Sequence, residues 1–316
     1  MPNHYLFTKI IFFLLLFNNL TYAQIEKVTI KVPIHIKAVL APGEKIKYKD
    51  GTTITDTDVY QEILVDIYKD KKINRGPYLI FNHGTSIGYS DSRDSINSKK
   101  MQSIGIFFAS NGFITIIPIR AGYGESGGPQ GDYKGTCSKP KIIEGMKNMT
   151  NQNLKVLEYV KNITYINTNE GLIAGISGGG GLSIAMTSEN IPGLKGVINF
   201  AGAILDTYSQ PKINNKDEFN DTNCATEETK LAFKYYGSLS KVPSLWLYSI
   251  NDKITGITKP MEWFESFQRA NYIPKGKFEF LSSYKLNGHD FIYDGKIWIP
   301  EFNKFLKEIN FSTIIK

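Results

Sequence analysis

Residues 171–181 read GLIAGISGGGG, and this short stretch decides how the rest of the sequence is interpreted. An apolar run from Leu172 to Ile176 ends abruptly at Ser177, and four consecutive glycines follow. A hydroxyl group in that position has three interpretations. Ser177 is a nucleophile on a sharp turn, or it belongs to a loop that cradles phosphate, or the segment is a glycine-rich connection without chemistry.

The spacing of the glycines favours the nucleophile. Gly175, Ser177 and Gly179 fit the pattern G-x-S-x-G, which marks a tight turn from a strand into a helix. The serine backbone is strained in such a turn, and small neighbours are needed because bulky ones would clash. The pattern follows a strand-like run and opens the small-residue, helix-like stretch GGGGLSIAM, as this turn requires.

Phosphate-binding loops fit less well. A dinucleotide-binding turn needs G-x-G-x-x-G and an acidic residue about 20 positions later. Gly178 and Gly180 supply the first pair, but Ser183 occupies the third position, and the next apolar run, VINFAGA, ends without an acid. A P-loop needs Gly-Lys-Ser/Thr, which is absent from this stretch.

The first residues, 1–23, are predicted to be a secretory signal peptide. Lys9 precedes an apolar block over residues 10–17, and small residues close the segment before a predicted cleavage after Ala23. The block is far shorter than the roughly 20 residues that cross a bilayer, so we expect no stable membrane anchor after processing. The mature chain, 24–316, is expected to be exported, either periplasmic or secreted, and to fold as a single domain.

Composition and charge bear on possible partners. The 41% hydrophobic and 13% aromatic content predicts a substantial core, and the formal net charge of +7 comes mainly from dispersed lysines. Dispersed lysines do not form the basic clusters of a nucleic-acid surface, so no nucleic-acid partner is expected. Nothing in the sequence predicts the oligomeric state.

Cys137 and Cys224 are the two cysteines of the chain. In an exported protein an even number of cysteines favours a disulfide. A metal pair would need further ligands at short spacing, and neither cysteine has a histidine or a second cysteine nearby. We therefore predict a disulfide between Cys137 and Cys224, and no metal site.

The hydrophobic pattern predicts an α/β fold. Apolar and polar residues alternate over 28–36, and a second strand is expected over 63–69, which indicates an antiparallel start. Short continuous apolar runs then alternate with helical patterns, as in a mainly parallel central sheet with helices on both faces. The expected strands are 77–84, 113–120, 171–177, 194–203, 243–252 and 277–283, and the expected helices are 98–110, 139–162, 179–189, 226–240, 259–271 and 300–310. In such sheets functional groups gather at the carboxyl ends of the strands.

A serine hydroxyl needs an adjacent base to act as a nucleophile at neutral pH. His289 is the better candidate, because it stands in the polar loop LNGHDF between the last strand and the last helix. His83 ends the first strand of the parallel series, where we expect it to brace the loop, and where the following amide can face a developing oxyanion. His4 leaves with the signal peptide, and His35 lies on the first strand, away from any carboxyl edge.

The third member of the site has to orient His289 and stabilise its imidazolium. Asp252 closes the strand-like run PSLWLYSIND, which precedes the strand leading to His289, so it falls at the carboxyl edge beside the base. Asp290 is less suitable because adjacent side chains diverge, and Asp294 is the alternative if the loop curls back. The competing interpretation of Asp252 is a cap on the turn before KITGITKP.

These motifs together resemble the α/β-hydrolase superfamily. The chain order Ser177, Asp252, His289 is the order of that superfamily. The nearest similarity is to exported serine esterase-like proteins grouped with the dienelactone hydrolases. It covers roughly residues 60–310, where FNHGTS, RAGYGESGGPQG, GISGGGG, INFAGA, PSLWLYSINDK and NGHDF occur in order.

The resemblance implies a role for each of these residues. Ser177 would attack an acyl carbonyl, His289 would take and return the proton, and Asp252 would hold His289, with no metal or organic cofactor. The N–H groups of Gly178 and Thr85 would form the oxyanion hole.

Two features depart from the family's patterns. Dienelactone hydrolases proper use cysteine as the nucleophile, and the oxyanion loop here reads His-Gly-Thr rather than three glycines. Neither the dienelactone substrate nor esters of bulky tertiary alcohols are therefore implied.

The resemblance also gives the polar segment at about 204–242 a role, because it is a usual place for a cap over the active site in that fold. A Cys137–Cys224 disulfide would tie the cap to the edge of the sheet. The short cap suggests small or medium-sized soluble esters as substrates.

The expected protein is a serine carboxylesterase, and two alternatives stay open. One is a peptidase or acyltransferase with the same three residues, and the other is a binding protein that keeps the fold without the chemistry.

Overall fold

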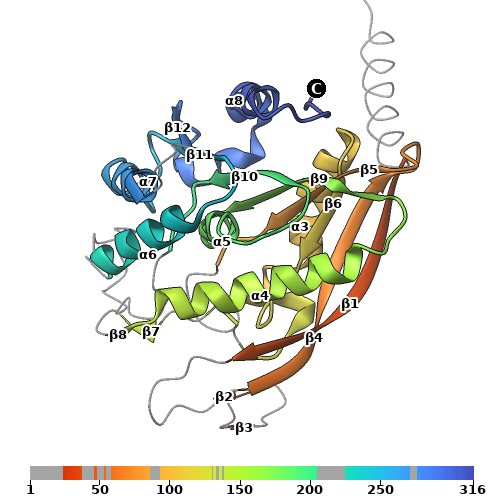
Figure 1. Ribbon diagram of the computed structural model, residues 1–316, viewed down its shortest axis with the longest axis horizontal. Coiled ribbons are helices and arrows are strands. Elements are labelled where there is room, and N and C mark those ends of the chain that lie inside the picture. Colours follow the sequence, from red (N-terminus) through yellow and green to blue (C-terminus); the bar gives the residue numbers. More distant parts are fainter. Residues whose placement is uncertain are drawn as a thin grey trace, which may run out of the picture.

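An eight-stranded sheet forms the centre of the protein, in the order β1-β4-β6-β5-β9-β10-β11-β12 (Figure 1). The computed structural model describes residues 24–37, 46–47, 53–54, 58–85, 93–129, 131–132, 135–136, 139–204, 225–270 and 276–316. Two small antiparallel ladders lie outside this sheet: β2 (Ile46–Lys47) with β3 (Thr53–Ile54), and β7 (Gly135–Thr136) with β8 (Lys139–Pro140).

The sheet starts antiparallel, as the alternating pattern predicts. β1 (Ile25–Lys37) pairs along its whole length with β4 (Asp58–Asp70), and this long ribbon forms one edge of the sheet (Figure 1). On β1, Val32, Ile34 and Ile36 are buried while the residues between them are exposed. The alternation therefore puts one face of the ribbon into the core.

The remaining strands are parallel to one another, and the predicted fold class is confirmed. β4 pairs antiparallel with β6, and the parallel series then runs from β6 to β12. Its members are β6 (Ile114–Pro118), β5 (Gly76–Asn82), β9 (Ile166–Ile176), β10 (Leu194–Phe200), β11 (Ser244–Ser249) and β12 (Gly276–Leu281). All residues of β5, β6 and β11 are buried, which explains their continuous apolar runs.

The order of the strands reverses at β5. From β5 the chain first adds β6 on one side, and then returns to add β9 on the other side. Loops that leave β5 and β9 at their carboxyl ends therefore diverge, and the crevice between them is the place where open α/β sheets bind ligands. Residues 83–85 follow β5 and Ser177 follows β9, so both segments lie at this point.

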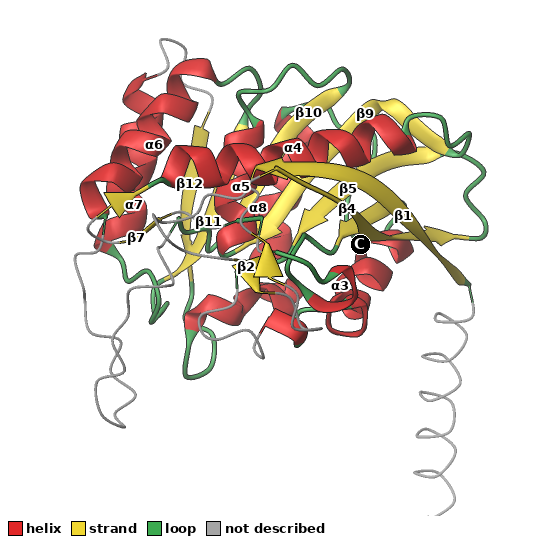
Figure 2. Cartoon of the chain, turned by 90° about the horizontal axis from the view of Figure 1, so that it is seen from below, coloured by secondary structure: helices red, strands yellow, loops and turns green. Residues whose placement is uncertain are grey.

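Helices cover both faces of the sheet. α4 (Ile142–Val160), α5 (Gly178–Met186) and α6 (Thr226–Leu239) contact one another on one face, and α7 (Thr258–Ala270) packs against α6 (Figure 2). α3 (Ser98–Ser110) packs on β4 and β6, and meets α8 (Gly295–Glu308) through aromatic side chains.

An aromatic cluster joins α3, α8 and the sheet. The Trp298 ring lies 5.0 Å from Phe200 and 5.4 Å from Phe302, measured between centroids, and Phe107 and Phe108 of α3 contact the same ring. The Trp298 indole N–H donates to the carbonyl of Ile292 at 3.0 Å, so its polar atom is satisfied. Phe291, two residues after His289, lies 6.0 Å from Phe200, so the cluster also contacts the segment that carries His289.

The last helix begins earlier than the sequence pattern indicates. α8 starts at Gly295 rather than near residue 300 and continues through Pro300. Asp294 is its N-cap, with a carboxylate oxygen 3.2 Å from the Lys296 N–H. The cap and the burial of Trp298 stabilise the first turns of the helix, although Pro300 lies within it.

Several expectations fall outside the described residues. They include the signal peptide (1–23), Cys137, Cys224 and residues 205–224 of the expected cap. The helical part of that segment, α6, packs on the sheet, where Phe233 lies 5.1 Å from the Trp246 ring of β11. None of the described helices is long and apolar enough to cross a membrane.

Replacing Trp298 by alanine tests the aromatic cluster. Trp298 is 1% exposed, so its removal leaves a cavity, and the free energy of unfolding is expected to fall by about 3–5 kcal/mol in urea titrations. Leu231 of α6 is 60% exposed, and Leu231→Ala is the control, with an expected change within about 0.5 kcal/mol. Equal stability of the two variants would show that the cluster does not hold α8 in place.

Candidate active site

Ser177 stands on the turn between β9 and α5, in a backbone conformation that favours glycine. Its φ is +56° and its ψ is −127°, and its N–H donates to the carbonyl of Phe200 at 3.0 Å. A non-glycine residue in this region is strained by about 1–3 kcal/mol, and such strain collects at functional sites. The turn predicted from G-x-S-x-G is therefore present in the structure.

Close approach of a neighbouring loop explains why glycines follow Ser177. A Cβ atom on Gly179 would collide with the carbonyl oxygens of Asn82 and His83, at the end of β5. A Cβ atom on Gly178 would collide with the Thr85 hydroxyl and lie 3.2 Å from the Thr85 nitrogen. The loop after β5 therefore lies directly against the start of α5, with no room for a side chain on either glycine.

His289 and Asp252 meet at the carboxyl edge of the sheet. The Nδ1 atom of His289 lies 2.9 Å from Oδ2 of Asp252, and both side chains are buried. The other carboxylate oxygen, Oδ1, accepts from the N–H groups of Ile254 and Thr255 at 2.8 and 3.1 Å. Asp252 thus holds the imidazole with one oxygen and caps its own turn with the other, so both interpretations of this residue describe it.

The contacts of Asp252 determine its charge. Burial by itself would raise the pKa of the Asp252 carboxyl, but the hydrogen bond and charge of His289 outweigh it, aided by the Thr255 and Ile254 amides. The net effect lowers the pKa, so Asp252 is ionised at neutral pH. An ionised carboxylate accepts from Nδ1–H, and the Nε2 atom of His289 is then left free to accept a proton.

Two asparagines that sequence reasoning missed join the loops of the acid and the base. Oδ1 of Asn287 accepts from the N–H groups of His289 and Lys253, each at 3.1 Å. Oδ1 of Asn251 accepts from the Tyr284 N–H at 3.0 Å, and the main-chain carbonyl of Asn251 accepts from the Gly288 N–H at 2.9 Å. The only sequence signal for these contacts is an asparagine beside each functional residue, as in IND and NGHD.

Ser177 and His289 line the same cavity, which has a volume of about 290 Å³. Its other walls come from the loop after β5, from α3 and its approach, and from the loops around Ile254 and Tyr293. No hydrogen bond in the described part of the chain joins the Ser177 hydroxyl to the imidazole. The structure therefore brings the two side chains to one cavity.

The two residues whose amides are predicted to form an oxyanion hole lie against each other, next to this cavity. Gly178 and Thr85 are the neighbours just described, and Thr85 lines the cavity with Ser177. Within the described residues neither amide N–H donates a hydrogen bond. Both donors are therefore available to a ligand oxygen above Ser177.

His83 lines the same cavity, but both of its ring nitrogens are engaged in hydrogen bonds that brace the loop. Its Nε2 atom accepts from the Arg120 N–H at 3.1 Å, so Nδ1 carries the proton and donates to the Gly84 carbonyl at 2.7 Å. Burial, followed by the Arg120 charge, holds the pKa of His83 well below its usual value. A neutral, fully engaged imidazole is suited to support the loop.

The other acidic and basic candidates named from the sequence make different contacts. Asp294 caps α8, and Asp290 is exposed at the rim of the cavity. His35 pairs with Asp58 at 2.9 Å and stacks on Tyr60 at 4.3 Å, on the β1–β4 ribbon. Within the described ranges, no group of three or more His, Cys, Asp or Glu side chains could hold a metal ion.

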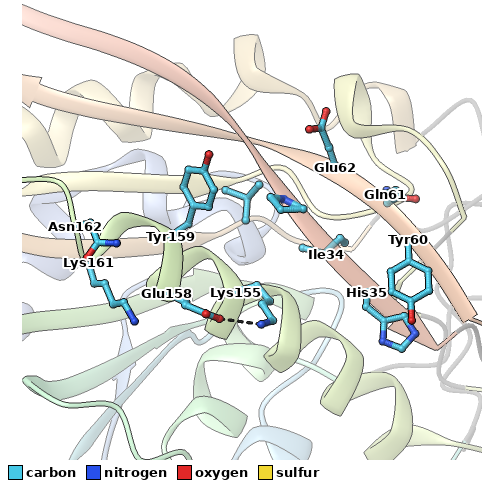
Figure 3. Close-up of a pocket in the computed structure, with 12 residues that line it drawn as sticks. Ile34, His35, Tyr60, Gln61, Glu62, Lys155, Glu158, Tyr159, Lys161 and Asn162 are labelled. Atoms are coloured by element: carbon cyan, nitrogen blue, oxygen red, sulfur yellow. Dashed lines mark hydrogen bonds and ion pairs between the residues drawn. The ribbon is translucent and has the colours of Figure 1, made fainter.

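A larger cavity of about 970 Å³ lies elsewhere, between the β1–β4 ribbon and α4 (Figure 3). Its walls include the stacked pair His35 and Tyr60, and the Lys155–Glu158 ion pair at 2.8 Å. None of the predicted site residues lines it. The smaller cavity, which holds the serine and the histidine, is the candidate active site.

Comparison with known proteins identifies the fold. No protein-family model matches the sequence, and no curated protein matches it. An esterase from Pyrococcus furiosus superimposes with a TM-score of 0.51 at 13% identity, over 88% of this chain and 96% of its own. An acetyl xylan esterase from Paenibacillus sp. R4 superimposes with a TM-score of 0.50 at 14% identity, over 93% of each chain. An acylaminoacyl peptidase from Pyrococcus horikoshii gives a TM-score of 0.54 at 13% identity, over 95% of this chain and 44% of its own. With the strand order and the turn at Ser177, these likenesses show that the chain has the α/β-hydrolase fold.

Proposed function

We propose that the protein is a serine hydrolase that cleaves small carboxylic esters through an acyl-serine intermediate. The observation that carries the proposal is the convergence of Ser177 and the Asp252–His289 pair on one cavity, at the point where the strand order reverses. These residues come from three different loops of the sheet edge. A surface loop without a function would not need a strained serine beside a buried imidazole–carboxylate pair.

Acylation follows from the protonation states of these groups. The Ser177 hydroxyl attacks the ester carbonyl carbon while Nε2 of His289 accepts its proton, and the C–O double bond becomes a single bond bearing an oxyanion. Asp252 stabilises the imidazolium through Nδ1–H and stays ionised. When the intermediate collapses, His289 returns the proton to the leaving alkoxide, and an alcohol departs.

Deacylation repeats these steps with water in place of the serine. His289 accepts a proton from water, hydroxide attacks the acyl carbon, and the proton returns to Ser177 as the carboxylic acid leaves. In both halves the oxyanion would lie against the amides of Gly178 and Thr85. Such donors stabilise the charge that develops only in the transition state.

The size of the cavity favours short substrates. Its volume of about 290 Å³ lies at the lower end of the range for small-molecule sites, roughly 300–1,000 Å³. Small acyl groups are therefore the proposed substrates. Because the structural neighbours include a peptidase as well as esterases, the test panel should contain amides and an alcohol acceptor besides esters.

Replacing Ser177 by alanine is expected to remove nearly all hydrolysis of p-nitrophenyl acetate and butyrate. Loss of the nucleophile in a comparable triad lowers kcat by about 10⁶-fold and leaves a residual of about 10³-fold over water. Ser188 also lies near α5, and its hydroxyl donates to the Ala185 carbonyl at 2.7 Å. Ser188→Ala is the control and should keep full activity. Undiminished turnover by Ser177→Ala would reject the nucleophile.

Asp252→Asn is expected to lower kcat by about 10⁴-fold, because an amide can stabilise the wrong tautomer of His289. The matched control is Asp294→Asn, since asparagine caps a helix as well as aspartate does and Asp294 is the alternative acid. Kinetics of the two variants on one ester decide between the acids. A large loss in Asp294→Asn with none in Asp252→Asn would reverse the assignment.

The lowered pKa of Asp252 predicts a pH-dependent stability. The ionised carboxylate stabilises the folded state above the unfolded pKa, near 3.9, and this contribution is lost as the pH falls through the lower folded pKa. The difference in the free energy of unfolding between wild type and Asp252→Asn should therefore be largest near pH 6–7 and shrink below about pH 4. Urea titrations at both ends of this range test it. A difference that does not change with pH would contradict the ionised carboxylate.

A further inference from the structure

We propose that Arg120 and Asp132 are positioning residues that hold the oxyanion loop, so that the Thr85 amide faces Ser177. This inference rests on the proposed function. Arg120 and Asp132 do not line the cavity, and they act on the reaction only through residues 83–85. Both side chains are fully buried, and they form an ion pair with 3.5 Å between Nη2 of Arg120 and Oδ2 of Asp132.

The side chain of Arg120 binds the main-chain carbonyls of the loop. Arg120 follows β6, the strand next to β5, and its guanidinium donates to two successive carbonyls: Nη1 to His83 at 2.7 Å and Nη2 to Gly84 at 3.1 Å. The His83 ring adds a second donor to the Gly84 carbonyl at 2.7 Å. This oxygen is thus held by two hydrogen bonds on the buried side.

The planar peptide bond transmits this constraint to the Thr85 amide. The Gly84 carbonyl and the Thr85 N–H belong to one peptide unit, and in a trans peptide they point in opposite directions. The structure contains no cis peptide bonds among the described residues. Because the carbonyl is directed at Arg120 and His83, the N–H is directed away from them, toward Gly178 and the space above Ser177.

Asp132 fixes the other end of the loop through side chains. Its Oδ2 atom accepts from the Thr85 hydroxyl at 3.2 Å and from the Tyr123 hydroxyl at 2.7 Å, and it is the oxygen paired with Arg120. Thr85 is therefore held on both sides, its peptide plane by Arg120 and its side chain by Asp132. This leaves the amide little freedom to rotate.

A buried ion pair is a costly way to hold a loop for stability alone. Apolar residues of similar volume often stabilise a fold as well or better. A guanidinium, however, offers several donors in a fixed plane, which a lysine or an apolar side chain cannot copy. The geometry of the contacts, two adjacent carbonyls and one hydroxyl, points to orientation of the loop as the role of the pair.

The first test compares Arg120→Lys and Asp132→Asn with a matched control, Asp66→Asn. Asp66 is also fully buried, and it accepts from Thr29 at 2.6 Å and Tyr68 at 3.4 Å and pairs with Lys27 at 2.9 Å, but it lies on β4. All three variants weaken a buried charge cluster. Only the first two should lower kcat, by about 10- to 100-fold with KM nearly unchanged, because misplacing an oxyanion donor acts on the transition state. The affinity for an alkyl boronic acid, which mimics the tetrahedral oxyanion, should fall in parallel.

Hydrogen exchange of the main-chain amide at position 120 of the full chain reports on the loop without turnover, because this N–H donates to the His83 ring at 3.1 Å. We expect faster exchange in Arg120→Lys and Asp132→Asn and no change in Asp66→Asn. Exchange and kcat at the wild-type level in the folded variants would overturn the proposal. Losses of kcat that match the unfolded fraction, or that Asp66→Asn reproduces, would overturn it too. If either variant does not fold, Tyr123→Phe removes a single hydroxyl from the same carboxylate and should give a smaller shift in the same two readouts.

The outcome also separates this inference from the proposed function. A wild-type protein that cleaves esters through Ser177, with variants that behave like wild type, would leave the hydrolase intact and refute the positioning role. A wild-type protein without activity on any ester or amide would refute the hydrolase. The exchange experiment would still decide whether Arg120 and Asp132 hold the loop.

Discussion

The contact between the end of β5 and the first turn of α5 is the constraint on which the rest of the structure depends. The carbonyls of Asn82 and His83 approach Gly179 so closely that no side chain fits between them. This approach places the Thr85 amide beside Gly178, and it aligns the loop after β5 with the strained serine. A larger residue in either position would push the loop after β5, and with it the Thr85 amide, away from Ser177, so the glycines are needed for the close approach of these two segments.

Two buried carboxylates support this geometry. Asp252 orients His289 with one oxygen and stabilises its own turn with the other, so that the base and the loop that carries it are held by one group. Asp132 binds Thr85, Tyr123 and Arg120 through a single oxygen beside the loop after β5. Each carboxylate is satisfied by several donors, as a buried charge must be, and in the proposed mechanism each acts on a reacting group through a neighbour.

Much of the fold could be predicted from the sequence because it depends on local hydrophobic patterns. The alternating apolar residues of β1 and the continuous apolar runs of β5, β6 and β11 reflect how many faces of each strand are covered. The predicted start of the last helix, near residue 300, was wrong, because the Asp294 cap and the burial of Trp298 extend α8 back to Gly295. The roles of Arg120 and Asp132 carried no local signal, because their partners are main-chain carbonyls and a threonine far away in the sequence.

By itself, the sequence determined the strand-to-helix turn at Ser177, the parallel sheet and the chain order of serine, aspartate and histidine. These follow from residue size and periodicity, which act over a few neighbouring positions. Only the tertiary structure decided that Asp252 rather than Asp294 meets His289, that His83 is a brace, and which groups hold the Thr85 amide. Such contacts depend on which strands lie side by side and on the direction in which each peptide plane faces, and neither is encoded within a single stretch of the chain.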